Sequence, residues 1–189
     1  MEQLMMLKFA NEPVEYKMPA GYEIRSVRDG NHEDAMGWIY ACETLNEGLW
    51  NEEQFVHEMI EDSDCGSDNI LLICRKNDGA IAGTATAKDG PLPALHMVGM
   101  NKEFFGQGLS YAICAAALNR MINHGVHRIQ LKTDEFRIPA IKTYLKMGFR
   151  PWYYLDDMPA RWQGVFADLG YDPEKYFAYD ATSFRRIPV

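Results

Sequence analysis

Six residues in one run combine two glycines with the start of an apolar stretch: Phe105, Gly106, Gln107, Gly108, Leu109 and Ser110. Glycine lets the main chain turn with positive φ and approach a ligand closely. Where such a turn opens a helix, the first backbone N–H groups have no partner within the helix, and the helix dipole adds positive potential. The run is therefore suited to holding a diphosphate without a lysine. Paired glycines are also common in simple turns, so the run alone does not identify a ligand.

One histidine and one tyrosine carry groups suited to acid–base chemistry. His96 lies on an expected strand, residues 94–100, and shares one face of it with Val98 and Met100 because strand side chains alternate. An unperturbed histidine titrates near neutral pH, so His96 is a candidate general base, although a structural or exposed histidine is the commoner case. Tyr144, on an expected helix, is by itself typical of a core residue whose hydroxyl has a partner.

Turn residues and apolar periodicity predict the elements that hold these groups. Asn31 is suited to cap a helix, Asn77-Asp78-Gly79 to close a β-hairpin and Gly125 to end a helix. The expected strands are residues 22–27, 70–75, 80–87, 94–100 and 126–133, with one more after the helix that Gly148 ends, where Trp152, Tyr153 and Tyr154 lie. The expected helices are residues 31–45, 51–62, 109–124, 139–148 and 159–169. This order predicts a mixed α/β sheet covered by helices.

The length and the ends of the chain set the expected organisation. A chain of 189 residues is near the usual size of one domain. We expect a single domain over residues 1–189, with an irregular N-terminal arm at residues 1–20 and a C-terminal extension at residues 155–189. No apolar run is long enough to cross a bilayer, and the first residues carry no basic leader. These features predict a cytoplasmic protein without a membrane partner.

Charge and cysteine content narrow the classes of partner. The formal net charge of −8 would repel a phosphate backbone, so nucleic acid is not an expected partner. The spacing of the cysteines fits neither a zinc site nor a disulfide framework: Cys42, Cys65, Cys74 and Cys114. We therefore expect reduced, mostly packed thiols and no metal.

The ordered set of motifs over residues 97–149 resembles the GNAT acetyltransferase superfamily. Val98-Gly99-Met100 is similar to the central strand of that family. The run from Phe105 to Ser110 resembles its Arg/Gln-x-x-Gly-x-Gly/Ala loop. The later signature, a helix with a tyrosine that ends in Gly-Phe, is matched by Ala140-Ile141, Tyr144 and Gly148-Phe149. One loop by itself would be weak evidence, whereas the ordered set is specific.

The resemblance implies a fold and a mechanism. The fold would be GNAT-like, with a central mixed, mostly antiparallel sheet flanked by helices. The co-substrate would be acetyl-CoA, with its pantetheine arm along Val98, Gly99 and Met100 and its pyrophosphate on the loop amides from Gly106 to Ser110. An amine would attack the thioester directly in a ternary complex, and Tyr144 would protonate the departing thiolate.

Two positions depart from the family pattern. Phe105 stands where the family usually has arginine or glutamine, so one pyrophosphate contact or loop-bracing interaction is missing. Arg137 stands where many members carry asparagine, and a charge contact to phosphate or to Asp134 would replace the usual one. A solvated arginine at a helix start is an equally good interpretation of Arg137.

Two other functions and the acceptor stay open. A CoA-binding sensor or interaction module with weak catalysis would account for both departures. A NAD-dependent oxidoreductase is disfavoured, because Tyr111 stands where its fingerprint needs a third small residue. The acceptor is expected to be a small-molecule or peptide amine, and a homodimer is retained as an option. Acidic residues that would suit a cationic amine, or form an ordinary solvated helix face, are Glu43, Glu47, Glu52 and Glu53.

Overall fold

The computed structural model describes residues 2–43, 45 and 50–189, and the chain divides into two compact units. The larger unit is Asn11–His127, and the smaller unit is Met1–Ala10 together with Arg128–Val189. Each unit has its own sheet and helices, so we describe each by itself. The single domain stays a prediction.

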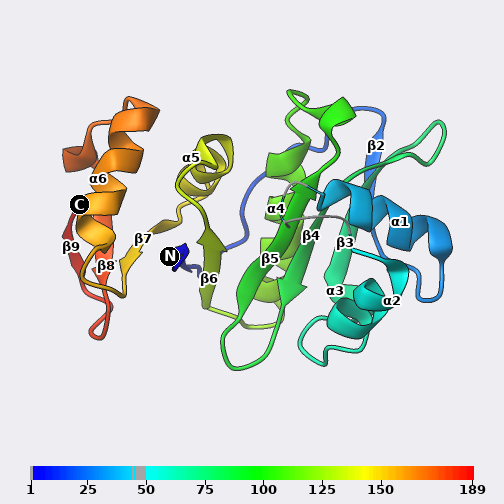
Figure 1. Ribbon diagram of the computed structural model, residues 1–189, viewed down its shortest axis with the longest axis horizontal. Coiled ribbons are helices and arrows are strands. Elements are labelled where there is room, and N and C mark those ends of the chain that lie inside the picture. Colours follow the sequence, from blue (N-terminus) through cyan, green and yellow to red (C-terminus); the bar gives the residue numbers. More distant parts are fainter. Residues whose placement is uncertain (1, 44, 46–49) are drawn as a thin grey trace. The chain divides into compact units, whose positions relative to one another are not determined.

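An antiparallel sheet forms the centre of the larger unit, in the order β2, β3, β4, β5 (Figure 1). Its strands are β2 (Tyr22–Ser26), β3 (Ile70–Arg75), β4 (Ile81–Lys88) and β5 (Ala94–Met100). Each neighbouring pair is antiparallel, with Tyr22 opposite Arg75 and Ile70 opposite Thr86 in the registers. The expected hairpin between β3 and β4 is confirmed, and its Gly79 has φ +75°.

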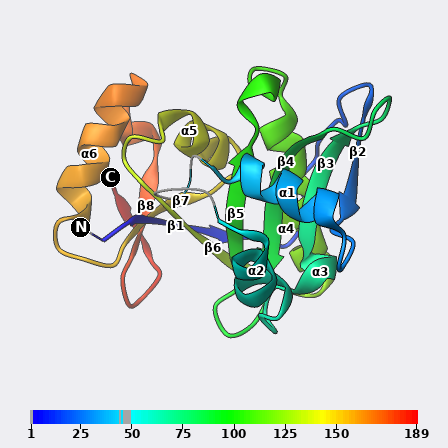
Figure 2. The ribbon, with the colours of Figure 1, turned by 45° about the vertical axis from the view of Figure 1, so that its right-hand side comes forward.

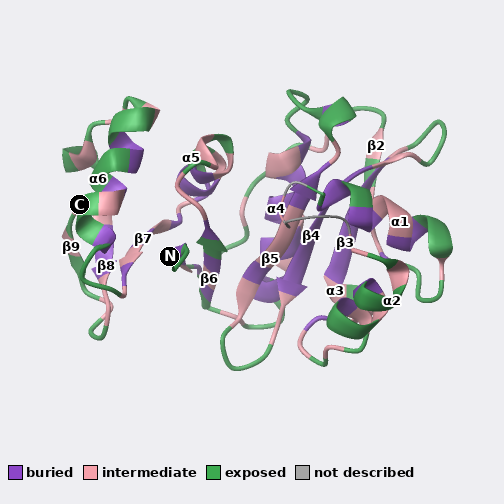
Figure 3. Cartoon of the chain, in the orientation of Figure 1, coloured by how far each residue is buried: buried purple, intermediate pink, exposed green. Residues whose placement is uncertain are grey.

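Helices cover this sheet on both faces. They are α1 (His32–Ala41), α2 (Glu52–Phe55), α3 (Gly66–Asn69) and α4 (Leu109–Asn123). In Figures 1 and 2, α1 lies in front of β4 and α4 lies behind it, so the two helices pack on opposite faces. Gly37 brings α1 close to β4, since a Cβ there would lie 2.2 Å from Cδ1 of Ile81. Most residues of β3, β4 and α4 are buried, as are half of those of α1 (Figure 3).

Two expected helices differ from the structure at their ends. The Asn31 side chain caps α1 by accepting the Asp34 N–H at 2.9 Å, as predicted, but the helix ends at Ala41 rather than near Leu45. Beyond Ala41 the chain makes turn hydrogen bonds, such as the Leu45 N–H to the Cys42 carbonyl at 2.9 Å. Leu45 nevertheless packs against the buried core.

The helix expected at residues 51–62 is α2 followed by a wider turn, the π-helix η1 (Val56–Ile60). The Glu61 N–H donates to the Val56 carbonyl at 2.9 Å, which is the five-residue bond of a π-turn. This turn buries Phe55 and Met59 but leaves Val56 only partly buried. Ile60 is also partly buried, and both side chains pack against the core of the larger unit.

The sheet of the smaller unit is built around the N-terminal strand. β1 (Leu4–Phe9) lies between β6 (Arg128–Thr133) and β7 (Arg150–Tyr153), antiparallel to both. The expectation of an irregular arm over residues 1–20 was wrong in this part. Residues 4–7 are all buried. They form a continuous apolar run, whereas a strand with one face in solvent alternates apolar and polar residues. Pairing partners more than a hundred residues away give the run its strand conformation.

The rest of the smaller unit adds two strands to this sheet and contains two α-helices. α5 (Ile138–Lys146) and α6 (Met158–Leu169) are close to their expected bounds. The C-terminal extension also contains β8 (Phe177–Asp180), parallel to β7, and β9 (Arg186–Pro188), antiparallel to β8. Because most strand pairs are antiparallel and helices flank the sheets, the expected mixed α/β fold class is confirmed.

A buried ion cluster joins β2 to the start of α1. The Asp34 carboxylate is fully buried and accepts hydrogen bonds from Arg25 Nη1 at 2.6 Å and Arg28 Nη2 at 2.8 Å. Burial by itself raises the pKa of Asp34, but the bonds from Arg25 and Arg28 outweigh it, so the pKa lies well below its ordinary value. Both arginines keep part of their side chains in solvent, which lowers the cost of burying their partner.

Candidate active site

A β-bulge interrupts β5 in the middle of the strand. Thr84 of β4 pairs with Gly99, while Thr86 pairs with His96, so β5 has one residue more than β4 between these pairs. Met97 in this interval has φ +44°, a conformation that is uncommon for a residue with a side chain. A bulge takes its extra residue out of the regular ladder, and such strain is concentrated at functional sites. The backbone at Met97 and Val98 is therefore a candidate binding surface.

The glycine run follows β5 and opens α4, as the sequence predicts. A short 3-10 helix, η2 (Lys102–Phe104), leads into it, and the Phe104 ring is buried. Gly106 and Gly108 have φ +79° and +74°, and α4 begins at Leu109. Among the described residues, no side chain caps this 15-residue helix at its N-terminus. A helix start without a side-chain cap is suited to an anion.

The surroundings of the two glycines show why glycine stands at these positions. A Cβ built on Gly106 or Gly108 would meet no atom within 4 Å, so there is open space beside the main chain. The positive φ, rather than a crowded neighbour, therefore requires glycine. We use "the glycine loop" for residues 105–110.

The side chains of the glycine loop take different positions. Leu109 is buried and anchors the start of α4, whereas Phe105 is 59% exposed. The Gln107 side chain accepts a hydrogen bond from the Tyr22 hydroxyl, with 2.6 Å between the oxygens. Tyr22 lies at the start of β2, so the loop is joined to a strand far away in the sequence. Sequence reasoning did not single out Tyr22, and no local pattern identifies it.

The predicted acid–base residues belong to different units. His96 is half-buried in the larger unit, at the start of the bulge. Tyr144 lies on α5 in the smaller unit, is 7% exposed, and packs edge to face on Phe149 with ring centroids 6.1 Å apart. The buried Tyr144 agrees with its expected core environment. The expectation that His96 and Met100 share one face of β5 was wrong, because the bulge adds a residue between them: His96 lies opposite Thr86, whereas Met100 lies opposite Gly83, on the other face. The catalytic roles of His96 and Tyr144 stay predictions.

Arg137 has a carboxylate partner in the smaller unit. Its Nε donates to Asp134 Oδ2 at 2.8 Å, directly before α5. Gln3 of the chain start also donates to Asp134, through Nε2 to Oδ1 at 3.1 Å. The contact to Asp134 that the sequence suggested is thus present. A contact to a phosphate is untested.

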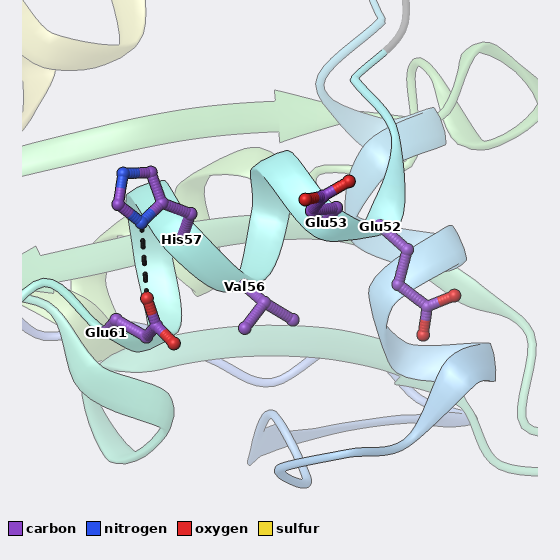
Figure 4. Close-up of a pocket in the computed structure, with 5 residues that line it drawn as sticks. All are labelled: Glu52, Glu53, Val56, His57 and Glu61. Carbon is purple, nitrogen blue, oxygen red and sulfur yellow. Dashed lines mark hydrogen bonds and ion pairs between the residues drawn. The ribbon is translucent and has the colours of Figure 1, made fainter.

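A shallow acidic pocket of about 370 Å³ lies over α2 and η1 (Figure 4). It is lined by Glu52, Glu53, Val56, His57 and Glu61. His57 Nδ1 lies 3.2 Å from Glu61 Oε2, and Glu52 pairs with His32 outside the pocket at 2.7 Å. Of the acidic residues named from the sequence, Glu52 and Glu53 line this pocket. Glu43 pairs with Lys102, and Glu47 lies outside the described residues.

The four cysteines are free, buried thiols, as expected. Burial raises the pKa of Cys65 and of Cys114 to about 12 and that of Cys42 further. These thiols are therefore protonated and inert at neutral pH. In the part of the chain that the structure describes, no group of side chains is arranged to hold a metal ion. Within the same ranges, every helix is too short or too polar to span a bilayer.

Comparisons with known proteins agree with this arrangement. Residues 33–149 match the model of the acetyltransferase (GNAT) family. A mycothiol acetyltransferase from Thermobispora bispora is 24% identical over 147 residues, which cover 72% of this chain and 49% of that protein. The chain thus spans about half the length of the curated relatives it matches.

Solved structures show the same fold. A GCN5-related N-acetyltransferase from Sphaerobacter thermophilus has a TM-score of 0.67 at 18% identity, over 80% of this chain and 49% of that one. A chain of the NatC complex bound to Gag peptide and CoA has a TM-score of 0.58 at 12% identity, over 67% of this chain and 82% of that one. At such identities the likeness shows the fold alone. The family model, which matches more than half of the chain, together with the bulge and the glycine loop, shows that this chain belongs to the acetyltransferase (GNAT) family.

Proposed function

We propose that this protein transfers an acetyl group from acetyl-CoA to a primary amine of a small molecule or peptide. The observation that carries the proposal is the succession of the β5 bulge, the glycine loop and the uncapped start of α4 within one unit. GNAT acetyltransferases use acetyl-CoA, and we assign one element of this chain to the acyl end of acetyl-CoA and another to its diphosphate. The bulge offers main-chain groups to the acyl end, and the loop offers main-chain amides to the diphosphate.

The glycine loop fits a diphosphate by its main chain alone. The main chain has positive φ angles at Gly106 and Gly108, no described side chain caps the start of α4, and the space beside both glycines is open. An anion there gains hydrogen bonds from the first amides of the helix and the favourable end of the helix dipole. The loss of arginine or glutamine at Phe105 leaves these donors in place. The pantetheine arm would then extend along the backbone of Val98, Gly99 and Met100.

The chemistry needs polarisation of a carbonyl and two proton transfers. Backbone N–H groups near Val98 and Met100 would donate to the thioester oxygen, where negative charge develops when the amine nitrogen attacks. A carbon–nitrogen bond forms as the carbon–sulfur bond breaks. Tyr144 would give its proton to the departing sulfur, and His96 or a water would take the proton of the amine. The roles of Tyr144 and His96 rest on the family resemblance and on ordinary acid–base chemistry.

A second candidate is a CoA-binding module that does not turn over. Two observations favour it. The Phe105 ring is exposed and offers no polar group to the loop, and the Arg137 guanidinium is paired with Asp134. This module would bind CoA with the same glycine loop and would differ from the enzyme only in the rate of thiol release.

A thiol-release assay with acetyl-CoA separates the two. The acceptor series contains polyamines, amino acids, aminoglycosides and peptide N-termini, and also the acceptor of the mycothiol acetyltransferases, since those are the named relatives. Release of CoA thiol that depends on one amine supports the enzyme and identifies its acceptor class. Binding of CoA by calorimetry without release supports the module. A folded protein that shows no heat and no thermal shift with millimolar CoA contradicts both.

A further inference from the structure

The glycine loop is held by one side chain from the opposite end of the larger unit's sequence. The Tyr22 hydroxyl donates to Gln107 Oε1 across 2.6 Å, and 85 residues separate the two in the chain. Gln107 stands between Gly106 and Gly108, the two residues with positive φ. The bond therefore meets the loop at its centre, where the main chain has the greatest conformational freedom.

Tyr22 is itself held in place by its neighbours. It is the first residue of β2, opposite Arg75 of β3 in the register. Its ring packs edge to face on the buried Phe104, with centroids 6.3 Å apart at 84°, and the Arg75 guanidinium lies 5.1 Å from the centre of the same Phe104 ring. Arg75 is in turn paired with Asp78 at 2.6 Å. The strand pairing and the aromatic contact thus fix the position from which the Tyr22 hydroxyl donates to Gln107.

This contact takes over a function that residue 105 does not perform. Phe105 has no polar side-chain atom, and its ring is largely in solvent, so it does not brace the loop. A loop with two glycines loses much conformational entropy when it binds a ligand in one shape. If a hydrogen bond already holds the loop in this shape before the ligand binds, the loop loses less conformational entropy on binding. The affinity for the ligand is then higher.

We propose that Tyr22 is a positioning residue that holds the glycine loop, through Gln107, in the shape that binds the diphosphate of CoA. The inference rests on the proposed function, because it names the residue that prepares its phosphate site. Tyr22 acts through Gln107 and needs no contact with CoA. Its effect is therefore on affinity for ligands that carry the diphosphate, and the rate of the chemical step does not depend on it.

The test compares Tyr22→Phe, which removes only the hydroxyl, with the unaltered protein. Calorimetry should show a Kd for CoA that is roughly 3- to 10-fold higher, as expected for one lost hydrogen bond. Binding of pantetheine, which lacks the diphosphate, should be unchanged in an NMR titration. Tyr40→Phe is the matched control, because Tyr40 is a half-exposed tyrosine of the same unit, and it should leave both affinities unchanged. Gln107→Ala combined with Tyr22→Phe should be no weaker than either single variant, since both remove the same bond.

A second measurement does not need CoA. Hydrogen exchange of the free protein should be faster at the amides of residues 106–110 in Tyr22→Phe and unchanged in α4 beyond its first turn. Equal Kd values for CoA in Tyr22→Phe and the unaltered protein would overturn the role of Tyr22 whatever the exchange shows, and so would equal weakening of CoA and pantetheine. A failure of the unaltered protein to bind CoA would overturn the proposed function, and this role with it.

Discussion

Gly99 of β5 and Ala41 of α1 are in contact through their main chains. A Cβ on Gly99 would lie 2.4 Å from the Ala41 carbonyl oxygen and 2.7 Å from the Ala41 carbonyl carbon. The last residue of α1 therefore rests on β5 directly after the bulge at Met97 and Val98. Because main-chain atoms on both sides make the contact, the end of α1 and the bulge cannot move independently.

This contact predicts the effect of Gly99→Ala. The added methyl group meets backbone rather than a flexible side chain, so the end of α1 must shift, and the free energy of unfolding should fall by about 1–3 kcal/mol. Urea denaturation measures this. Gly164→Ala on α6 is the control, because a Cβ there meets nothing within 4 Å and alanine favours helix. A Gly99→Ala protein as stable as the unaltered one would show that the contact is looser than described.

Removal of the Tyr144 hydroxyl tests the proposed general acid. Tyr144→Phe should bind CoA with unchanged affinity and, because the departing thiolate loses its proton donor, lose roughly 100-fold or more in turnover. Steady-state thiol release together with calorimetry separates the two effects. Tyr154→Phe, which loses a hydroxyl that donates to the Gln3 carbonyl, should keep its rate. An unchanged rate in Tyr144→Phe removes this residue from the mechanism.

The positive φ of Gly108 in the glycine loop leads to a third prediction. Gly108→Ala must hold an alanine at φ +74°, which costs about 1–2 kcal/mol. The loop should relax to another shape, and the Kd for CoA should rise. Gly30→Ala has a similar strain, at φ +67° before α1, also with open space around the new methyl group. Gly30→Ala should lower stability by a similar amount with no change in CoA affinity. Equal CoA affinities in both variants would argue against a diphosphate at the loop.

The buried carboxylate of Asp34 makes stability depend on pH. Arg25 and Arg28 lower the pKa of Asp34 in the folded protein. The charged carboxylate therefore contributes its full stabilisation above the pKa that Asp34 has in the unfolded chain. This stabilisation is lost as the pH falls through the pKa in the folded protein. Asp34→Asn should lower the free energy of unfolding by about 3 kcal/mol at pH 7, since it leaves the two arginines without their partner. The difference from the unaltered protein should shrink below about pH 4, where the unfolded carboxyl is protonated. Urea titrations at several pH values measure it, and a difference that stays constant with pH contradicts the assignment.

Local signals in the sequence determined most of the elements. Asn31 starts α1, Asn77-Asp78-Gly79 closes the hairpin, and Gly108 and Gly125 bound α4, because each of these residues acts on the few residues next to it. The glycine loop, with its residue types, its spacing and its positive φ angles, was also predictable. The spacing of the cysteines likewise predicted free, mostly packed thiols.

Tertiary structure decided the features that depend on partners far away in the chain. β1 is a strand because residues 128–133 and 150–151 pair with it, and its own apolar run indicates no single conformation. The bulge at Met97 exists only in the register with β4, and the bond from Tyr22 to Gln107 exists only because β2 and the glycine loop meet in the fold. Neighbouring residues set turns and caps through short-range sterics and hydrogen bonds. Pairing, register and long-range bonds are instead chosen by the packing of the whole unit, which no local pattern encodes.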